Sequence, residues 1–331
     1  MASVPVIDVH THMLSQPWVD ELRKHGGPKY EVKPTKAGQE SVYLRGNPFV
    51  TLTPGMFDYD LRIANMDKAG VDVAIVSLTC PSVYWGGEAV SSANAVAMND
   101  LMAYQQSRYP DRIRFFATLP WQYADRAVAE LRRAVTAGAV GVFVSANIDG
   151  ESLTAPQFAP VWEAIDQLAL PVLVHPTAPQ GAVDLQLDEY GLVPPVGFMI
   201  DTTLAISRMI LDGFLDRYPN LAIIAAHGGA TLPYLAGRLD RCHAMIPACA
   251  EKISDKPSSY LKKIYYDAVV YEPGALNLCL EVAGGPERVM YGSDYPHNIG
   301  DMEGCLARVN ALDPGVSKLI KSGTAQKLFK L

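Results

Sequence analysis

The chain has 331 residues, of which 49% are hydrophobic and 19% are charged, and its formal net charge is -7. This composition excludes an intrinsically disordered chain and allows a sizeable core. The negative charge and the lack of Lys/Arg runs argue against a nucleic-acid partner. No run of about 18 apolar residues predicts a membrane span, so we expect no membrane partner either.

Cysteine usage and the N-terminal segment bear on the cellular compartment. The five cysteines are an odd number, lie far apart and form no CxxC pair. They argue against a disulfide framework or a cysteine zinc site. Residues 1–8 lack the basic start and long apolar run of a signal peptide. We therefore expect a cytoplasmic protein.

Short apolar runs alternate with segments of helical spacing along the chain. The predicted strands are residues 4–9, 73–78, 114–119, 140–144, 171–175, 221–227, 264–269 and 289–294. The predicted helices with the clearest apolar stripes are residues 58–69, 124–137, 156–168 and 202–218. Eight strands that alternate with helices predict an α/β fold, a single (β/α)8 barrel of the TIM type. The rival is an open doubly wound sheet, but no GxGxxG follows the first strand.

One long segment, residues 14–57, lacks clear periodicity and holds several Pro and Gly residues. We interpret it as an insertion between the first strand and its helix. In a barrel, this position places it over the catalytic face as a small cap. Residues 1–331 are thus expected to form one domain that includes the cap.

Four of the seven histidines follow predicted strands. His10 and His12 end the first strand, and because side chains i and i+2 point the same way, both can converge on one ion. His175 ends the fifth strand, His227 the sixth and Asp294 the eighth. Each alone reads as a core histidine or a turn residue. In a barrel, however, these strand ends surround the catalytic mouth, and imidazole and carboxylate are ligands for ions such as Zn²⁺.

Four sequence motifs at these strand ends resemble those of a known family: DVHTH at residues 8–12, VHP at 174–176, AHGG at 226–229 and GSDYP at 292–296. They resemble the decarboxylase branch of the amidohydrolase superfamily, and within it the 2-amino-3-carboxymuconate 6-semialdehyde decarboxylases. The similarity runs from Ile7 to the last residues of the chain. It implies a TIM barrel with a divalent metal ion at the carboxyl ends of its strands.

The fourth strand bears on the number of ions. Binuclear members of this superfamily carry a bridging Lys or Glu at its end, whereas residues 141–147 read GVFVSAN. We therefore predict one divalent ion, most readily Zn²⁺ with Mn²⁺ as the alternative. Its predicted ligands are His10, His12, His175 and Asp294, with water in the open position.

This assignment leaves His227 free. An imidazole exchanges protons near neutral pH. The resemblance implies that His227 is the general acid/base beside the metal-bound water. The alternative is a fifth ligand, or a ligand of a second ion.

Two reaction classes suit such a site. A carboxylated substrate could lose CO2, or an amide, ester or lactone could be hydrolysed. The resemblance favours the first: a metal-dependent, non-oxidative decarboxylase, a carbon–carbon lyase of aromatic compound catabolism, acting on a small aromatic or muconate-type acid. His227 and Asp294 are its predicted catalytic residues. A non-catalytic barrel with a structural zinc is the third interpretation.

A carboxylate substrate calls for a cationic partner, and the planar guanidinium of arginine suits it. By resemblance, Arg238 matches an arginine that reaches the active site of the neighbouring subunit, which implies a homodimer. The plain alternative is an exposed ion pair of Arg238 with Asp240 or Glu251.

Two positions and one segment depart from the resembling decarboxylases; the segment, residues 177–181, reads TAPQG and lacks their bulky residues. Their second carboxylate-binding arginine corresponds to Val50, although Arg45 lies nearby. Their phenylalanine after Asp-Tyr-Pro is replaced by His297. These changes predict a rebuilt pocket, and a hydroxylated aromatic acid becomes a candidate substrate.

Overall fold

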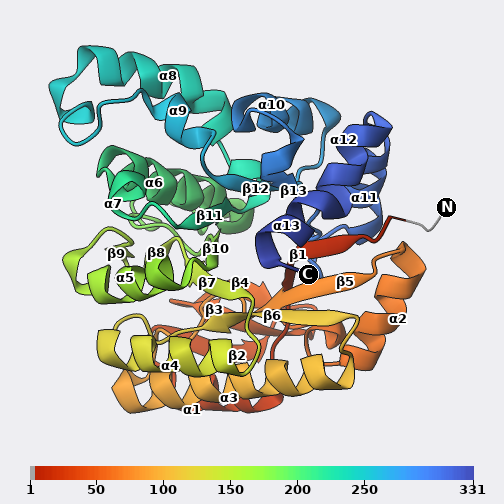
Figure 1. Cartoon of the computed structure of the whole chain (residues 1–331). Helices are drawn as coiled ribbons and strands as arrows, with labels where there is room; N and C mark the ends of the chain where they lie inside the picture. The colour runs from red at the N-terminus through yellow and green to blue at the C-terminus, as the bar shows by residue number, and fades with distance from the viewer. Residues whose placement is uncertain (1–3) are drawn as a thin grey trace.

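A ring of eight parallel strands forms the centre of the computed structural model, which describes residues 4–331 (Figure 1). In order around the ring these strands are β1 (Ile7–His12), β5 (Val73–Ser77), β6 (Ile113–Thr118), β7 (Gly141–Ser145), β10 (Pro171–His175), β11 (Ala222–Ala225), β12 (Tyr265–Asp267) and β13 (Val289–Met290). The main-chain N–H of Val9 donates to Tyr291 O at 3.0 Å, and that of His12 donates to Tyr295 O at 2.7 Å. These bonds bring the last strand back to the first, which confirms the predicted α/β barrel of the TIM type.

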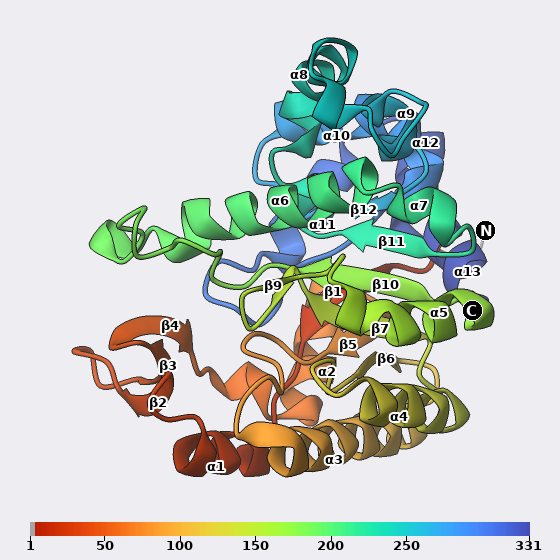
Figure 2. The same ribbon diagram turned by 90° about the vertical axis from the view of Figure 1, so that its left-hand side faces the viewer.

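Helices follow the strands and cover the outside of the ring (Figures 1 and 2). They are α2 (Tyr59–Ala69), α3 (Gly87–Arg108), α4 (Ala124–Thr136), α5 (Ala159–Leu168), α6 (Phe198–Leu211), α7 (Phe214–Arg217), α8 (Leu232–Met245), α9 (Pro257–Leu261), α10 (Pro273–Ala283), α11 (Met302–Asn310), α12 (Pro314–Lys318) and α13 (Thr324–Phe329). None of the helices in residues 4–331 is both long and apolar enough to cross a membrane. Residues 1–3, part of the N-terminal segment 1–8 in which we predict no signal peptide, lie outside the described residues.

The predicted helix 202–218 is two helices in the structure, α6 and α7, and α6 begins earlier than expected, at Phe198. Gly213 separates them with a φ of 69°, a conformation that side chains disfavour. A Cβ atom at Gly213 would also lie 2.7 Å from Lys252 O. The apolar stripe continues through this break, which explains why spacing alone predicted one helix.

The barrel interior is filled by the inward-facing residues of the strands. Phe116, Phe143 and Leu173 are fully buried in this cluster, and Phe329 of α13 packs on Phe116 with ring centroids 5.6 Å apart. Inward positions lie two residues apart along a strand. The next inward-facing position after Leu173 is therefore His175. The same alternation that packs the core thus points this imidazole into the barrel mouth.

Residues 14–57 are more regular than their sequence pattern suggested. They form α1 (Gln16–His25) and a three-stranded antiparallel sheet of β2 (Tyr30–Pro34), β3 (Glu40–Leu44) and β4 (Asn47–Thr51). Figure 2 shows this sheet beyond the carboxyl ends of the barrel strands, on the side toward which the β11 arrow points. A two-stranded hairpin, β8 (Asn147–Ile148) with β9 (Glu151–Ser152), follows β7.

Candidate metal centre

Three donor atoms converge where β1 and the segment after β13 end. The Nε2 atoms of His10 and His12 lie 3.2 Å apart, and Asp294 Oδ1 lies 3.4 Å and 3.1 Å from them. Donor atoms bound about 2.0–2.2 Å from one ion are about 3.0–3.5 Å from each other. The three spacings therefore fit donors that share a single ion.

The remaining ring nitrogens of the predicted ligands face oxygen atoms. His10 Nδ1 lies 2.6 Å from Asp267 Oδ2, and the Nδ1 atoms of His12 and His175 lie 3.3 and 2.8 Å from main-chain carbonyl oxygens. In metal sites this second hydrogen bond fixes the tautomer and leaves Nε2 for the ion. His175 Nε2 is buried and has no hydrogen-bond partner among residues 4–331. The set of donors thus fits a divalent metal ion.

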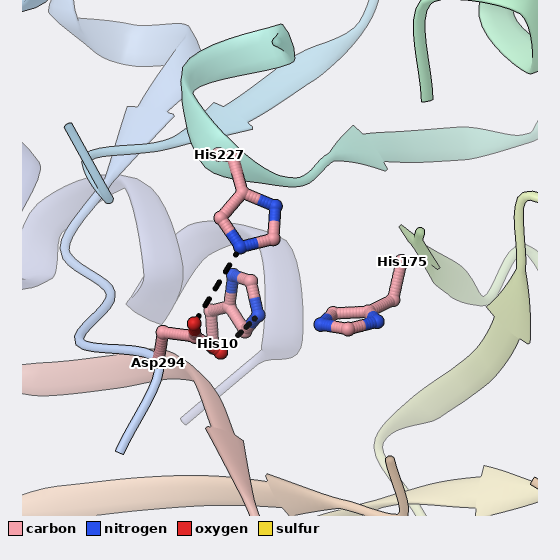
Figure 3. Close-up of side chains that lie close together, drawn as sticks. All are labelled: His10, His175, His227 and Asp294. Carbon is pink, nitrogen blue, oxygen red and sulfur yellow. Dashed lines mark ion pairs between the residues drawn. The ribbon is translucent and has the colours of Figure 1, made fainter. Parts of the chain in front are cut away.

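His227 approaches the same carboxylate from its other oxygen. His227 Nε2 lies 3.6 Å from Asp294 Oδ2, whereas His10 lies near Oδ1 (Figure 3). His12 also lies near Oδ1. His227 Nδ1 is buried and has no hydrogen-bond partner in the described part of the chain. One donor atom from each of His10, His175, His227 and Asp294 lies within 4.8 Å of the others. The structure therefore brings five of the six predicted site residues together, and the division between ligands and acid/base stays a prediction.

The cluster has the electrostatics of a cation site. Burial by itself opposes protonation of His10, yet Asp267 and Asp294 raise the pKa of His10 to about 10. Burial lowers the pKa of His12 to about 3 and that of His175 well below its usual range. The buried carboxylates of Asp267 and Asp294 thus stabilise a positive charge at His10. A divalent ion supplies that charge and releases the proton.

Asp267, at the end of β12, is a site residue that the sequence analysis missed. It is fully buried, and besides His10 it accepts the main-chain N–H groups of His227 at 2.9 Å and Gly228 at 2.9 Å. Burial raises the pKa of Asp267, but attraction to His10 outweighs it and holds the pKa below its usual range. One carboxylate therefore orients a predicted ligand and the predicted acid/base together. Its place at the end of the seventh strand was the available signal.

His227 and Asp294 do not extend their strands as predicted. Both have a φ of 57°, in the left-handed region that few side chains other than Asn, Asp and His adopt. The Asp267 carboxylate holds the N–H of His227, and His10 O accepts the N–H of Asp294 at 2.8 Å. Strained backbone of this kind persists where surrounding contacts fix it, and it gathers at functional sites.

Buried charges behind β1 hold the strand end in place. Arg62 of α2 donates from Nη1 to Thr11 Oγ1 at 2.6 Å and stacks its guanidinium 4.7 Å from the Tyr295 ring centre. Asp8 accepts from Ser293 Oγ at 2.5 Å and Ser293 N at 3.1 Å. Because these contacts tie β1 to residues 293–295, the histidines of β1 keep a fixed distance from Asp294.

A cavity of about 820 Å³ lies between the cap and the barrel loops. Tyr30 and Phe49 line it from the cap, and Tyr84, Asn147 and Thr177 line it from the loops after β5, β7 and β10. No residue of the cluster lines this cavity, and Thr177, two residues after His175, is the lining residue nearest to the cluster in the sequence. A small organic substrate fits a space of this size.

Of the departures from the resembling family, residues 177–181 line this cavity, whereas Val50 and His297 are not among its lining residues. Val50 is buried in the core of the cap, and Arg45 is exposed on the β3–β4 turn, where it lines the cavity. His297 lies beside the cluster, with its ring centroid 4.9 Å from that of His12. Burial lowers the pKa of His297.

Arg238 is not brought to this site. It is exposed on α8, which lies at the edge of the molecule in both views (Figures 1 and 2). Nor does it form the alternative ion pair within the described residues, because Asp240 instead accepts from Ser258 N at 2.8 Å and Ser258 Oγ at 2.7 Å. Its guanidinium therefore remains available to a neighbouring molecule.

Comparisons with known proteins agree with this geometry. A 2-amino-3-carboxymuconate-6-semialdehyde decarboxylase from Dictyostelium discoideum is 30% identical over 301 residues, which cover 89% of this chain and 83% of the relative. The crystal structure of 5-carboxyvanillate decarboxylase from Sphingomonas paucimobilis is 28% identical, with a TM-score of 0.86 over 99% of this chain and 100% of that one.

A second 5-carboxyvanillate decarboxylase, from Novosphingobium aromaticivorans, was solved as a mutant with bound manganese. It is 25% identical, with a TM-score of 0.86 over 99% of this chain and 98% of that one. The sequence model of the amidohydrolase family matches residues 7–331, nearly the whole chain. This protein therefore belongs to the amidohydrolase family.

Proposed function

We propose that the protein is a metal-dependent, non-oxidative decarboxylase of a small aromatic or muconate-type carboxylic acid. The observation that carries the proposal is the convergence of His10 Nε2, His12 Nε2 and Asp294 Oδ1, with His227 on the other carboxylate oxygen. The decarboxylases to which the chain is similar support the reaction class. The activity belongs to the breakdown of aromatic compounds.

In this proposal His10, His12, His175 and Asp294 hold one divalent ion. A single ion is favoured because β7 ends in Ser145, which cannot bridge two ions as Lys or Glu does. We propose Zn²⁺, since imidazole and carboxylate suit it, with Mn²⁺ as the alternative supported by the relative with bound manganese. When bound, the ion polarises oxygen atoms of the substrate and of water.

His227 moves the proton that replaces CO2. The bond between the carboxylate and its carbon breaks, the electron pair stays on that carbon, and His227 Nε2 delivers a proton to it. Asp294 Oδ2, 3.6 Å from Nε2, keeps the imidazole turned toward the cluster. Asp267 fixes the main chain of His227 at the same time.

A CO2-release assay tests the reaction class. The metal-loaded protein is incubated with a panel of hydroxybenzoic and muconic acids, and with matched amides, esters and lactones. Release of CO2 from at least one acid, with no hydrolysis of the matched compounds, supports the decarboxylase. Hydrolysis without CO2 release makes the protein a hydrolase, and turnover of neither class favours a structural metal.

We further propose that Arg238 binds the substrate carboxylate of a neighbouring subunit in a homodimer. Its exposure on α8 and its lack of an ion pair with Asp240 or Glu251 in the described structure support this role. Arg238→Ala is expected to weaken substrate capture about ten- to a hundredfold, because one charge-assisted hydrogen bond is lost, while metal content stays unchanged. Steady-state kinetics and elemental analysis measure the two quantities.

Mixing weakened Arg238→Ala chains with nearly inactive His227→Asn chains, at a substrate concentration too low for either variant to turn over well, tests whether Arg238 acts across subunits. A hybrid dimer would hold one site with both residues intact, so partial activity is expected to return. Exchange of subunits without recovery of activity would assign Arg238 to its own chain's site or to none.

We propose that the chain works in the cytoplasm as one domain of residues 1–331, with residues 14–57 as the cap. All five cysteines are free thiols, which supports a reducing compartment. The cap supplies one wall of the cavity, which supports its inclusion in the same unit.

A further inference from the structure

His297 borders the metal cluster without belonging to the proposed ligand set. Its donor atom lies within 4.8 Å of donors on His12 and Asp294. Its side chain is only partly buried, whereas the neighbouring ligands are buried. His297 therefore lies where the cluster meets accessible space.

The orientation of the His297 ring is fixed. Its main-chain N–H donates to Asp294 O at 3.1 Å, and its carbonyl accepts the N–H of Gly300 at 2.9 Å. Its Nε2 lies 2.9 Å from Oγ1 of Thr79, a fully buried residue in the segment after β5. Main-chain bonds near Asp294 thus hold the backbone of His297, and Thr79 after β5 holds its ring.

The Thr79 hydroxyl also favours one position for the proton of the His297 ring. Its O–H can donate toward Cys80 Sγ, 3.9 Å away, which leaves its oxygen free to accept the N–H of His297 Nε2 at 2.9 Å. The neutral ring then has a lone pair on Nδ1. Among the described residues, His297 Nδ1 has no hydrogen-bond partner, and the atom is not buried. An acceptor that an incoming molecule can reach therefore lies next to His12.

We propose that His297 Nδ1 accepts a hydrogen bond from a hydroxyl or amino group of the substrate and thereby selects acids that carry this group. The inference rests on the proposed function, since it names the chemistry of the acid that the decarboxylase takes. His297 is a specificity-determining residue in this proposal and is neither a metal ligand nor the proton donor.

The Asp294 carboxylate, whose oxygen lies within 4.8 Å of a His297 ring nitrogen, favours a neutral donor over a second carboxylate at this place. Within the described structure, the cations that line the cavity are Lys29, which pairs with Asp149, and Arg45, which is exposed. A phenolic hydroxyl needs no such partner. A site that accepts a hydrogen bond also discriminates against analogues that lack the donor, because its own polar atom is then left unpaired.

Calorimetric binding tests the inference separately from turnover. The metal-loaded protein is titrated with 2-, 3- and 4-hydroxybenzoate, with the corresponding methoxybenzoates and with unsubstituted benzoate. At least one hydroxy acid is expected to bind about three- to tenfold more tightly than its methoxy partner and than benzoate, the worth of one neutral hydrogen bond.

His297→Phe removes the acceptor while keeping a ring, and it is expected to abolish this preference. Thr79→Val removes the hydrogen-bond partner of His297 Nε2 and is expected to reduce the preference. His25→Phe, on the exposed face of α1, is the matched control and is expected to retain the preference. A preference that survives His297→Phe, or its absence in the unaltered protein, would overturn the inference. Loss of metal in His297→Phe would also overturn it, because His297 would then be a ligand.

The outcomes for the reaction class and for His297 are separable. If no acid releases CO2 but His297→Phe abolishes the hydroxyl preference, the decarboxylase fails and the binding role stands. If CO2 is released and His297→Phe leaves the preference unchanged, the decarboxylase stands and the role of His297 is wrong.

Discussion

Replacing His175 with alanine is expected to take the protein from close to one equivalent of divalent metal to almost none. His175 Nε2 is buried and has no partner among the described residues, while its Nδ1 is held by a carbonyl oxygen 2.8 Å away. The imidazole is thus oriented to give one lone pair to the ion. Removing a residue that merely orients a ligand costs about 10–100-fold in metal affinity, so losing the ligand itself is expected to cost more than a hundredfold.

Elemental analysis after desalting measures both the amount and the identity of the ion. His25→Ala provides the matched control, since this histidine is exposed on α1 and, among residues 4–331, pairs only with Glu21 at 3.5 Å. The control is expected to keep the full equivalent. Two tightly bound ions per unaltered chain, or an undiminished metal content in His175→Ala, would show that the ligand assignment is wrong.

The barrel was predictable because its strands carry a strong local signal. Strands buried on both faces are short, continuous apolar runs, and all eight of the predicted runs overlap barrel strands of the structure. The alternation that buries Leu173 also aims His175 inward, so the core and the site share one pattern. The convergence of His10 and His12 follows from the same alternation.

The strands of the cap and the backbone conformation of His227 and Asp294 could not be predicted from the local sequence pattern. The strands β2–β4 pair only with one another, and their faces mix polar and apolar residues, so no period-2 signal distinguished them. The left-handed backbone of His227 and Asp294 is imposed by contacts with Asp267 and His10, which are distant in the chain. Asp267 lies inside the predicted strand 264–269, where a single acid gives no sign of a shared site, which is why it was missed.

These same contacts determine how His227 is best tested. At a φ of 57°, alanine would add backbone strain, whereas asparagine tolerates the left-handed region. Asparagine also keeps the N–H that Asp267 accepts, so the turn of residues 227–229 is expected to hold. His227→Asn therefore removes the imidazole with little change to the surrounding chain.

His227→Asn is expected to keep its metal and to lose about 10²–10⁴-fold in turnover, the usual worth of a positioned acid/base. The metal stays because His227 Nε2 approaches Asp294 Oδ2, while His10 and His12 share Oδ1. Turnover falls because an amide cannot carry the proton that replaces CO2. Single-turnover kinetics and elemental analysis of the same preparation separate the two effects. A metal content that falls in parallel with activity would make His227 a ligand, and the proton would then have to come from another group in the cluster.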